Sequence, residues 1–157
     1  MRLTDLLTPE RVAIRHNISQ HPLDKAGALG TLAQLLSAGT QVDARLVERV
    51  LKEREQLQST GIGEGVAIPH GALPLLETQH ASLLIVPEGV DFAAIDSAPV
   101  NILFAVIGPK RATGEHLKTL ARVSRLLRNK TFRDRLAGAA DAAEAYNLIA
   151  REEEDRR

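Results

Sequence analysis

The sequence predicts a single α/β domain in which helices lie on both sides of a small β-sheet. Segments with apolar residues three and four positions apart alternate with two short, aliphatic, β-branched runs that are typical of buried strands. The chain has 157 residues, 44% of them hydrophobic, which fits one domain with a substantial core. We expect this domain to cover residues 1–150 and the charged residues 151–157 to form a frayed tail.

The N-terminal third is expected to be mainly helical. Val12–Ile14 can form a short strand, and the stretch that Pro22 opens carries leucines on one helical face, with Gly39 just past its end. Asp43 is expected to cap the next helix. Arg54 lies one turn beyond Val50 on the buried face of that helix, so its charge either caps the helix end or serves a site.

Two strands are predicted in the middle of the chain. Ala81–Val86 and Val100–Ile107 are short, apolar and β-branched, and Pro-Gly-containing segments bound them. Residues 89–96, which lie between them, are expected to form a loop or an edge strand. The sequence does not determine the order of the strands in the sheet.

Helical patterns return in the last third. Thr113 is expected to cap a helix with an apolar face, and Thr131–Leu136 to form a short helix. Asp141, with Glu144 three residues later, resembles a capping box and predicts the start of the last helix.

The composition excludes several classes of function. Twenty basic and twenty acidic residues cancel, so the chain lacks the basic excess of a nucleic-acid-binding protein. Without cysteine it has no disulfides, thiolate metal sites or cysteine nucleophiles. No segment approaches the roughly 20 apolar residues of a membrane span, and no signal peptide is recognisable at the N-terminus. We therefore expect a cytoplasmic protein without membrane insertion.

His70 is the main candidate for chemistry. Pro69 disfavours a helical conformation at Ile68 and has no backbone donor, so His70 should stand at the end of an extended segment. Gly71 follows and leaves room for another molecule to approach. The alternative from spacing alone is an ordinary surface histidine in a tight loop.

A glycine-rich run precedes His70. Gly61, Gly63 and Gly65 stand at alternate positions after Thr60, and such glycines can turn backbone amides toward an anion. We therefore predict that these four residues contact phosphate. A nucleotide-binding loop is disfavoured, because no Gly-Lys-Ser/Thr follows and the run leads into Ile-Pro-His rather than a helix.

Two further residues fit a phosphate site. With Thr113 as the N-cap, His116 lies in the first turn of its helix, where free amides and the helix dipole favour phosphate and a neutral imidazole. Arg54 offers a permanently charged, fork-shaped guanidinium. The alternatives are a solvent-facing polar residue for His116 and a hydrated helix-end arginine for Arg54.

Other sites are weakly supported by the sequence. His16, His21 and His80 have no comparable neighbours and are expected to be structural or surface residues. A metal site built on His70 and His116 has no third ligand at a suitable spacing. A serine hydrolase is disfavoured because the Gly-x-Ser-x-Gly elbow is absent.

The segment Ser59-Thr-Gly-Ile-Gly-Glu-Gly-Val-Ala-Ile-Pro-His70-Gly resembles the phosphorylation site of the mannitol/fructose-class enzyme IIA domains of the bacterial phosphotransferase system. The likeness is greatest to the nitrogen-related members. It continues through 92–106, 116–127 and 129–136, in order and without large gaps. The resemblance implies a mannitol-type enzyme IIA fold, a mixed sheet flanked by helices.

The resemblance also implies a role for each candidate residue. His70 matches the phospho-accepting histidine, His116 the histidine that orients the phosphoryl group, and Arg54 the arginine that neutralises it. The implied function is a phosphocarrier that receives phosphate from an HPr- or NPr-like phosphohistidine carrier, without metal or cofactor. A regulatory role toward target proteins is expected; the alternatives are a sugar-specific enzyme IIA that serves a permease component and a binding module that is not phosphorylated.

Overall fold

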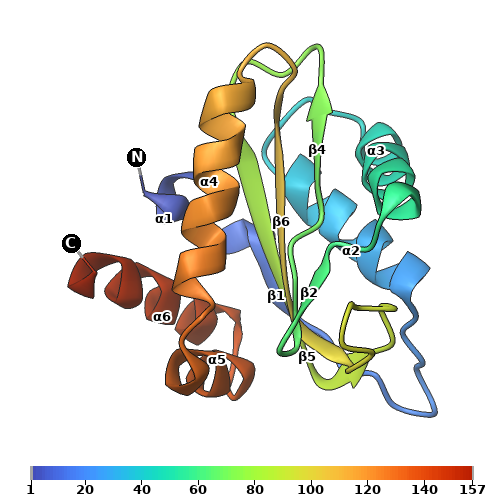
Figure 1. Ribbon diagram of the computed structural model, residues 1–157, viewed down its shortest axis with the longest axis vertical. Coiled ribbons are helices and arrows are strands. Elements are labelled where there is room, and N and C mark those ends of the chain that lie inside the picture. Colours follow the sequence, from blue (N-terminus) through green and yellow to red (C-terminus); the bar gives the residue numbers. More distant parts are fainter. Residues whose placement is uncertain (1, 157) are drawn as a thin grey trace.

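The computed structural model describes residues 2–156 (Figure 1). The helices are α1 (Leu3–Leu6), α2 (Lys25–Ser37), α3 (Ala44–Leu57), α4 (Thr113–Leu126), α5 (Lys130–Ala137) and α6 (Ala142–Asp155), with a 3₁₀ turn at Pro9–Arg11. The strands are β1 (Val12–Ile14), β2 (Gly61–Gly63), β3 (Val66–Ala67), β4 (His70–Leu73), β5 (His80–Val90) and β6 (Val100–Pro109). The predicted α/β class and all three predicted strands are confirmed.

The six strands form one mixed sheet. Its order is β1-β5-β6-β3-β2, and β4 also pairs with β6. β5 and β6 are antiparallel at the centre, whereas β1 is parallel to β5. β3 and β4 both run parallel to β6, β3 opposite Ile102–Leu103 and β4 opposite Val106–Pro109. The two short strands thus lie end to end along β6 as one interrupted strand, and His70 begins its second part.

Each face of the sheet has its own core. Along β6, Leu103, Ala105 and Ile107 face the core beneath α2 and α3, whereas the alternate residues Ile102, Phe104 and Val106 face the opposite core. Figure 1 shows α2 and α3 on one side of the sheet, and α1, α4, α5 and α6 on the other. The aliphatic side chains that the composition predicts fill both layers.

The helix starts follow the predicted caps, with two corrections. Asp43 accepts a hydrogen bond from the Arg45 amide and Asp141 one from Glu144. α2 begins at Lys25 rather than at residue 22, because Asp24 caps it by accepting from Gly27. Thr113 is the first helical residue of α4 and Ala112 is the N-cap, so Thr113 does not cap the helix as predicted.

The expected frayed tail is helical as far as the structure describes it. α6 continues to Asp155. The Glu153 carboxylate accepts from the Leu3 amide at 2.6 Å and from the Thr4 amide at 3.1 Å. The prediction of a tail from residue 151 was wrong because this carboxylate joins the end of α6 to the exposed amides of α1. Arg157 lies outside the described residues.

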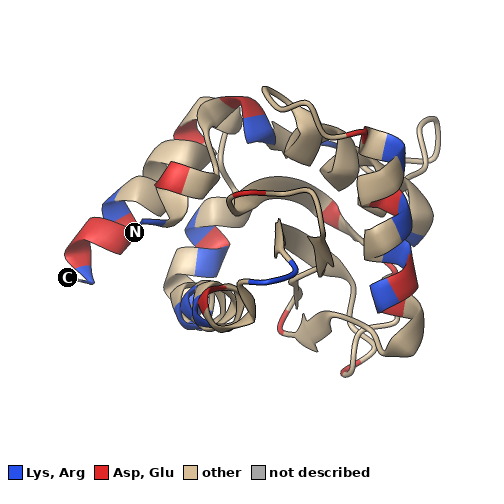
Figure 2. Cartoon of the chain, turned by 90° about the horizontal axis from the view of Figure 1, so that it is seen from above, with Lys and Arg blue, Asp and Glu red and all other residues tan. Residues whose placement is uncertain are grey.

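The charges are spread over the surface. Figure 2 shows basic and acidic residues interspersed along the helices, as the neutral composition predicts. Within residues 2–156, no helix combines the length and the apolar character needed to cross a membrane.

Candidate functional site

A break between the two short strands that pair with β6 places His70. After β3, Ile68 and Pro69 leave the ladder, and pairing resumes at His70 opposite Val106. The Val106 amide donates to the carbonyl of Pro69 at 3.0 Å, so the break remains tied to β6. The extended conformation that Pro69 favours at Ile68 is therefore held in register up to the histidine.

One hydrogen bond determines how the His70 ring is protonated. Nδ1 lies 2.8 Å from the carbonyl oxygen of Ile68, two residues earlier. A carbonyl only accepts, so this contact requires a proton on Nδ1. In the neutral ring Nε2 then carries the free lone pair, and among the described residues it has no hydrogen-bond partner. His70 thus presents an unprotonated nitrogen from a half-buried ring.

Close packing of α3 on β4 brings Arg54 to this region. A Cβ atom on Gly71 would overlap Cγ1 of Val50, so only glycine lets the helix approach this closely. Arg54 follows one turn later. Its Nη1 donates to the carbonyl of Gln58 at 2.8 Å, so Arg54 also caps its own helix, which was the alternative predicted for it.

His116 approaches His70 from the other layer. It lies in the first turn of α4, and the two imidazole centroids are 5.8 Å apart with the rings tilted by 52°. Nδ1 of His116 is buried and has no hydrogen-bond partner within residues 2–156, and the same holds for Oε1 of Gln79. A Cβ atom on Gly108 would lie 3.1 Å from Cγ of Gln79 and 3.2 Å from Nδ1 of His116, so both side chains pack against this glycine. The enclosed Nδ1 leaves Nε2 as the nitrogen available to a bound anion.

The electrostatic environment favours neutral histidines. Burial is the main cause that lowers the pKa of His70; Arg54 also lowers it, while the Ile68 hydrogen bond and Glu55 raise it. Burial, followed by the charge of His70, lowers the pKa of His116. At neutral pH both rings are therefore uncharged, and the fixed positive charge facing His70 is that of Arg54.

The glycine run has a structural explanation. Glu64 and Gly65 both have positive φ angles, 59° and 77°, and form the tight turn of the β2–β3 hairpin. A Cβ on Gly61 would lie 2.7 Å from that of Ala94, so this glycine allows close packing. The amides of Thr60 and Gly61 already donate to Glu55 and Ser59. Phosphate binding by Thr60, Gly61, Gly63 and Gly65 stays a prediction.

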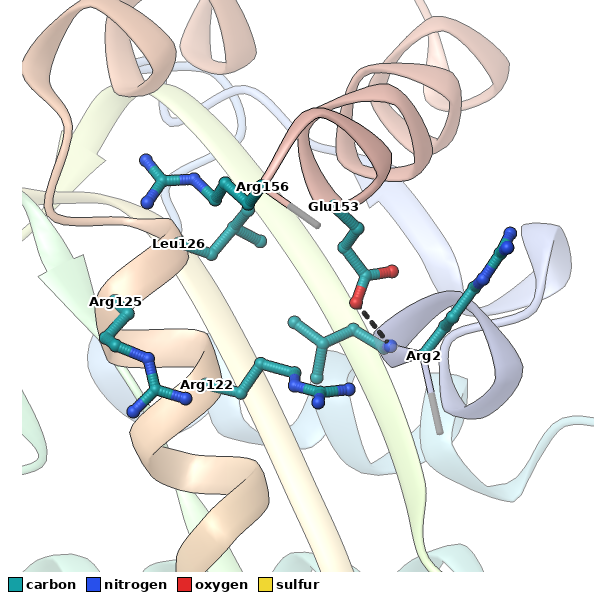
Figure 3. Close-up of a pocket in the computed structure, with 7 residues that line it drawn as sticks. Arg2, Arg122, Arg125, Leu126, Glu153 and Arg156 are labelled. Carbon is teal, nitrogen blue, oxygen red and sulfur yellow. Dashed lines mark hydrogen bonds between the residues drawn. The ribbon is translucent and has the colours of Figure 1, made fainter.

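The remaining candidates lie apart from this constellation. His16 pairs with Glu88 at 2.7 Å, and His21 forms a bridge with Ile18. No group of three potential metal ligands occurs in the described part of the chain. A hollow of about 430 Å³ between α1, α4 and α6 is lined by arginines (Figure 3), but none of Arg54, His70 and His116 contributes to it. The histidine site is therefore separate from this cavity.

Sequence comparison assigns this arrangement to a known family. Residues 6–152 match the family described as phosphoenolpyruvate-dependent sugar phosphotransferase system, EIIA 2. The chain belongs to this EIIA type 2 family. It is a phosphotransferase-system component that carries phosphoryl groups, and the EIIA family interacts with phosphocarriers and with permease components.

Individual members of the EIIA family are similar to this chain in sequence and in structure. A nitrogen regulatory protein from Bradyrhizobium diazoefficiens is 37% identical over 150 residues, which cover 96% of this chain and 95% of that protein. The nitrogen regulatory protein IIA-Ntr from Neisseria meningitidis superposes with a TM-score of 0.83 at 28% identity, over 94% and 98% of the two chains. The mannitol IIA of Escherichia coli has the same fold, with a TM-score of 0.71 at 21% identity, over 89% and 96%.

Proposed function

We propose that this EIIA protein accepts a phosphoryl group on Nε2 of His70 from a cytoplasmic phosphohistidine carrier of the HPr or NPr type. The observation that carries the proposal is the hydrogen bond from Nδ1 of His70 to the carbonyl of Ile68. It holds the proton on the inner nitrogen and directs the lone pair of Nε2 outward, where a docked donor can present its phosphorus.

The transfer step needs no proton to move. The lone pair of Nε2 forms a new N–P bond in line with the P–N bond that breaks, and the electron pair of that bond remains on the donor imidazole. Such transition states are loose, so positioning and charge stabilisation supply most of the catalysis. The activated P–N bond arrives with the donor, and the step requires neither metal nor nucleotide.

We assign the phosphoryl oxygens to two side chains. Arg54 from α3 supplies positive charge, and His116 from α4 donates one hydrogen bond from Nε2 as a neutral ring. The two imidazole centroids are 5.8 Å apart, so we propose that a phosphoryl group on Nε2 of His70 lies within reach of the His116 ring. The amides of Thr60, Gly61 and Glu64 already donate within the protein, so the remaining amides of the segment 60–65 are the further proposed contact for the oxygens.

We further propose a regulatory role. A phosphohistidine adds a group with about −1.5 to −2 charges to this site, enough to change which protein binds there. The 37% identity to a nitrogen regulatory protein supports this role. The sugar-specific alternative, in which the protein passes phosphate to a permease component, is supported by the sugar phosphotransferase description of the family.

Phosphorylation with purified components tests the proposal. The protein is incubated with phosphoenolpyruvate, enzyme I and HPr, or with the nitrogen-type pair, and its intact mass is measured. We expect one acid-labile phosphoryl group on the wild type and on the control His21→Ala, none on His70→Ala, and slower but detectable addition to His116→Ala. No added mass with either donor pair would refute the phosphocarrier and support the binding module.

A second assay separates the two roles. The phosphorylated protein is mixed with fructose- and mannitol-type permease components, and the loss of phosphate from the protein is followed. Retention of the phosphate supports the regulatory role, whereas rapid transfer to a permease component supports the sugar-specific one.

A further inference from the structure

Glu55 is a buried carboxylate at the end of α3 that the proposed chemistry does not use. Only 4% of its side chain is exposed. The Thr60 amide donates to both of its oxygens at 3.0 Å, and the Thr60 hydroxyl donates to Oε1. Nζ of Lys25 lies 2.8 Å from Oε2. A buried carboxylate is costly unless it is paired in this way, so the four contacts explain how it is tolerated.

The contacts of Glu55 and of its neighbours Lys25 and Ser59 join four segments of the chain. Lys25 is the first residue of α2. Its Nζ also donates to the backbone carbonyl of Phe92 at 2.9 Å and lies 4.6 Å from the centroid of the Phe92 ring. Ser59 donates to the same carbonyl. Glu55 therefore fixes the segment that leaves α3 against both α2 and the loop after β5.

The same contacts continue to the proposed nucleophile. The carbonyl of Thr60 accepts from the Ile68 amide at 3.0 Å. The carbonyl of Ile68 in turn accepts from Nδ1 of His70 at 2.8 Å. An uninterrupted series of hydrogen bonds thus runs from the Glu55 carboxylate through Thr60 and Ile68 to the imidazole.

We propose that Glu55 is a positioning residue for phosphoryl transfer, which holds Thr60 and, through Ile68, fixes the His70 ring with Nε2 outward. The proposal rests on the proposed function for its kinetic consequence. Its structural consequence, the orientation and protonation of the His70 ring, is independent of that function.

The electrostatics of the site give this role a distinct signature. The charged and titratable groups facing His70 are Arg54 and Glu55 from α3 and His116 from α4. Because the Glu55 carboxylate raises the pKa of His70, its neutral amide analogue is expected to lower that pKa further. The pKa responds to the loss of the Glu55 charge by itself, whereas the tautomer depends on the Ile68 hydrogen bond, so a residue that only stabilises the fold would leave the tautomer of His70 in the folded protein unchanged.

The experiment compares Glu55→Gln with Glu55→Asp and with Glu53→Gln, which removes an exposed negative charge from the same helix. The imidazole ¹⁵N shifts of His70 in the unphosphorylated full chain report its tautomer and pKa, and steady-state phosphorylation gives kcat and KM separately. For Glu55→Gln we expect a lower His70 pKa, a mixed tautomer and a kcat reduced by about 10- to 100-fold with KM little changed. Glu55→Asp should keep more of the wild-type kcat than Glu55→Gln does, and Glu53→Gln should match the wild type in kcat and in the His70 pKa and tautomer.

A milder pair of variants applies if Glu55→Gln does not fold. Thr60→Val removes the hydroxyl contact and keeps the carboxylate, whereas Thr60→Ser keeps both. Reduced kcat and an altered His70 tautomer in Thr60→Val, but not in Thr60→Ser, are the expected results.

An unchanged His70 tautomer and kcat in folded Glu55→Gln or Thr60→Val would overturn the positioning role. If no donor phosphorylates the wild type, the proposed function fails, and the ¹⁵N measurements alone then decide whether Glu55 orients His70.

Discussion

At the scale of single residues, the site depends on keeping two histidines neutral and correctly oriented beside one arginine. Burial lowers the pKa of both His70 and His116, and the Ile68 carbonyl selects the Nδ1-protonated form of His70. In the proposed transfer, the ring is thereby prepared as a nucleophile before the donor arrives. This arrangement predicts a particular response to pH.

The rate of His70 phosphorylation should begin to fall with decreasing pH only below pH 6.5. Protonation of Nε2 removes the lone pair that attacks phosphorus, so the rate falls only as the pH drops through the lowered pKa of His70. The rate should therefore stay level from pH 8 to below about 6.5, the value of free histidine. Single-turnover phosphorylation from a pre-phosphorylated carrier measures this, with carrier stability as the control. A limb above pH 6.5 would contradict the neutral-histidine account.

Sequence patterns identify the candidate site residues better than the residues that support them. Pro69 and the helix spacing singled out His70, His116 and Arg54, and the structure brings the two histidines together. Glu55 was missed, although Val47, Leu51 and Glu55 are the buried residues of α3. The signal was a carboxylate one turn beyond Leu51 on a buried face, the same kind of signal that marked Arg54. The Ile68 carbonyl carries no such signal, because backbone contacts depend on the fold.

At the scale of elements, the site requires α3 to lie close to β4. Gly71 makes this possible because any side chain there meets Val50. The helix carries Arg54 and Glu55 in its last turn, so its distance from the strand sets where both charges act.

Gly71→Ala should weaken both stability and transfer. The added methyl group forces α3 away from β4, and overpacking of this kind costs about 1–3 kcal/mol in the free energy of unfolding. Val50→Ala removes the clashing atoms, so the double variant should lose less free energy of unfolding than the two single variants lose together. Urea denaturation of the four proteins in this cycle measures the coupling. Additive free energies would show that the two residues are not in contact.

Periodic elements were predictable and special backbone conformations were not. β5 and β6 are marked by aliphatic, β-branched runs, and α3 and α6 by a capping aspartate and an apolar stripe. The β2–β3 hairpin was not predicted from the glycine run, since glycines that permit a tight turn and glycines that expose amides to phosphate leave the same pattern. Glu64 at positive φ is also indistinguishable in sequence from an ordinary loop residue.

At the scale of the whole molecule, the two ends of the described chain are joined on the face opposite α2 and α3. α1 has only four residues, too few to be predicted from periodicity, and the Glu153 carboxylate binds its first amides. The sequence shows only a run of charges here, because the partners lie 149 and 150 positions away.

Glu153→Ala is expected to lower the free energy of unfolding by about 1–2 kcal/mol, as does the loss of a capping carboxylate elsewhere. The exposed neighbour Glu154 serves as the control, and Glu154→Ala should change stability by no more than about 0.5 kcal/mol. Denaturant unfolding gives both values. Phosphorylation of both variants should match the wild type, since this contact is remote from His70. If the two substitutions lower the free energy of unfolding equally, the Glu153 contact contributes nothing to stability.

The most direct test of the account is the identity of the phosphorylated atom. The ¹⁵N-labelled protein is phosphorylated by its carrier, and nitrogen–phosphorus couplings in the histidine rings are measured by NMR. Phosphorus on Nε2 of His70, with Nδ1 still protonated, is the predicted result. Phosphorus on Nδ1 of His70, or on His116, would contradict the orientation of the ring on which the mechanism rests.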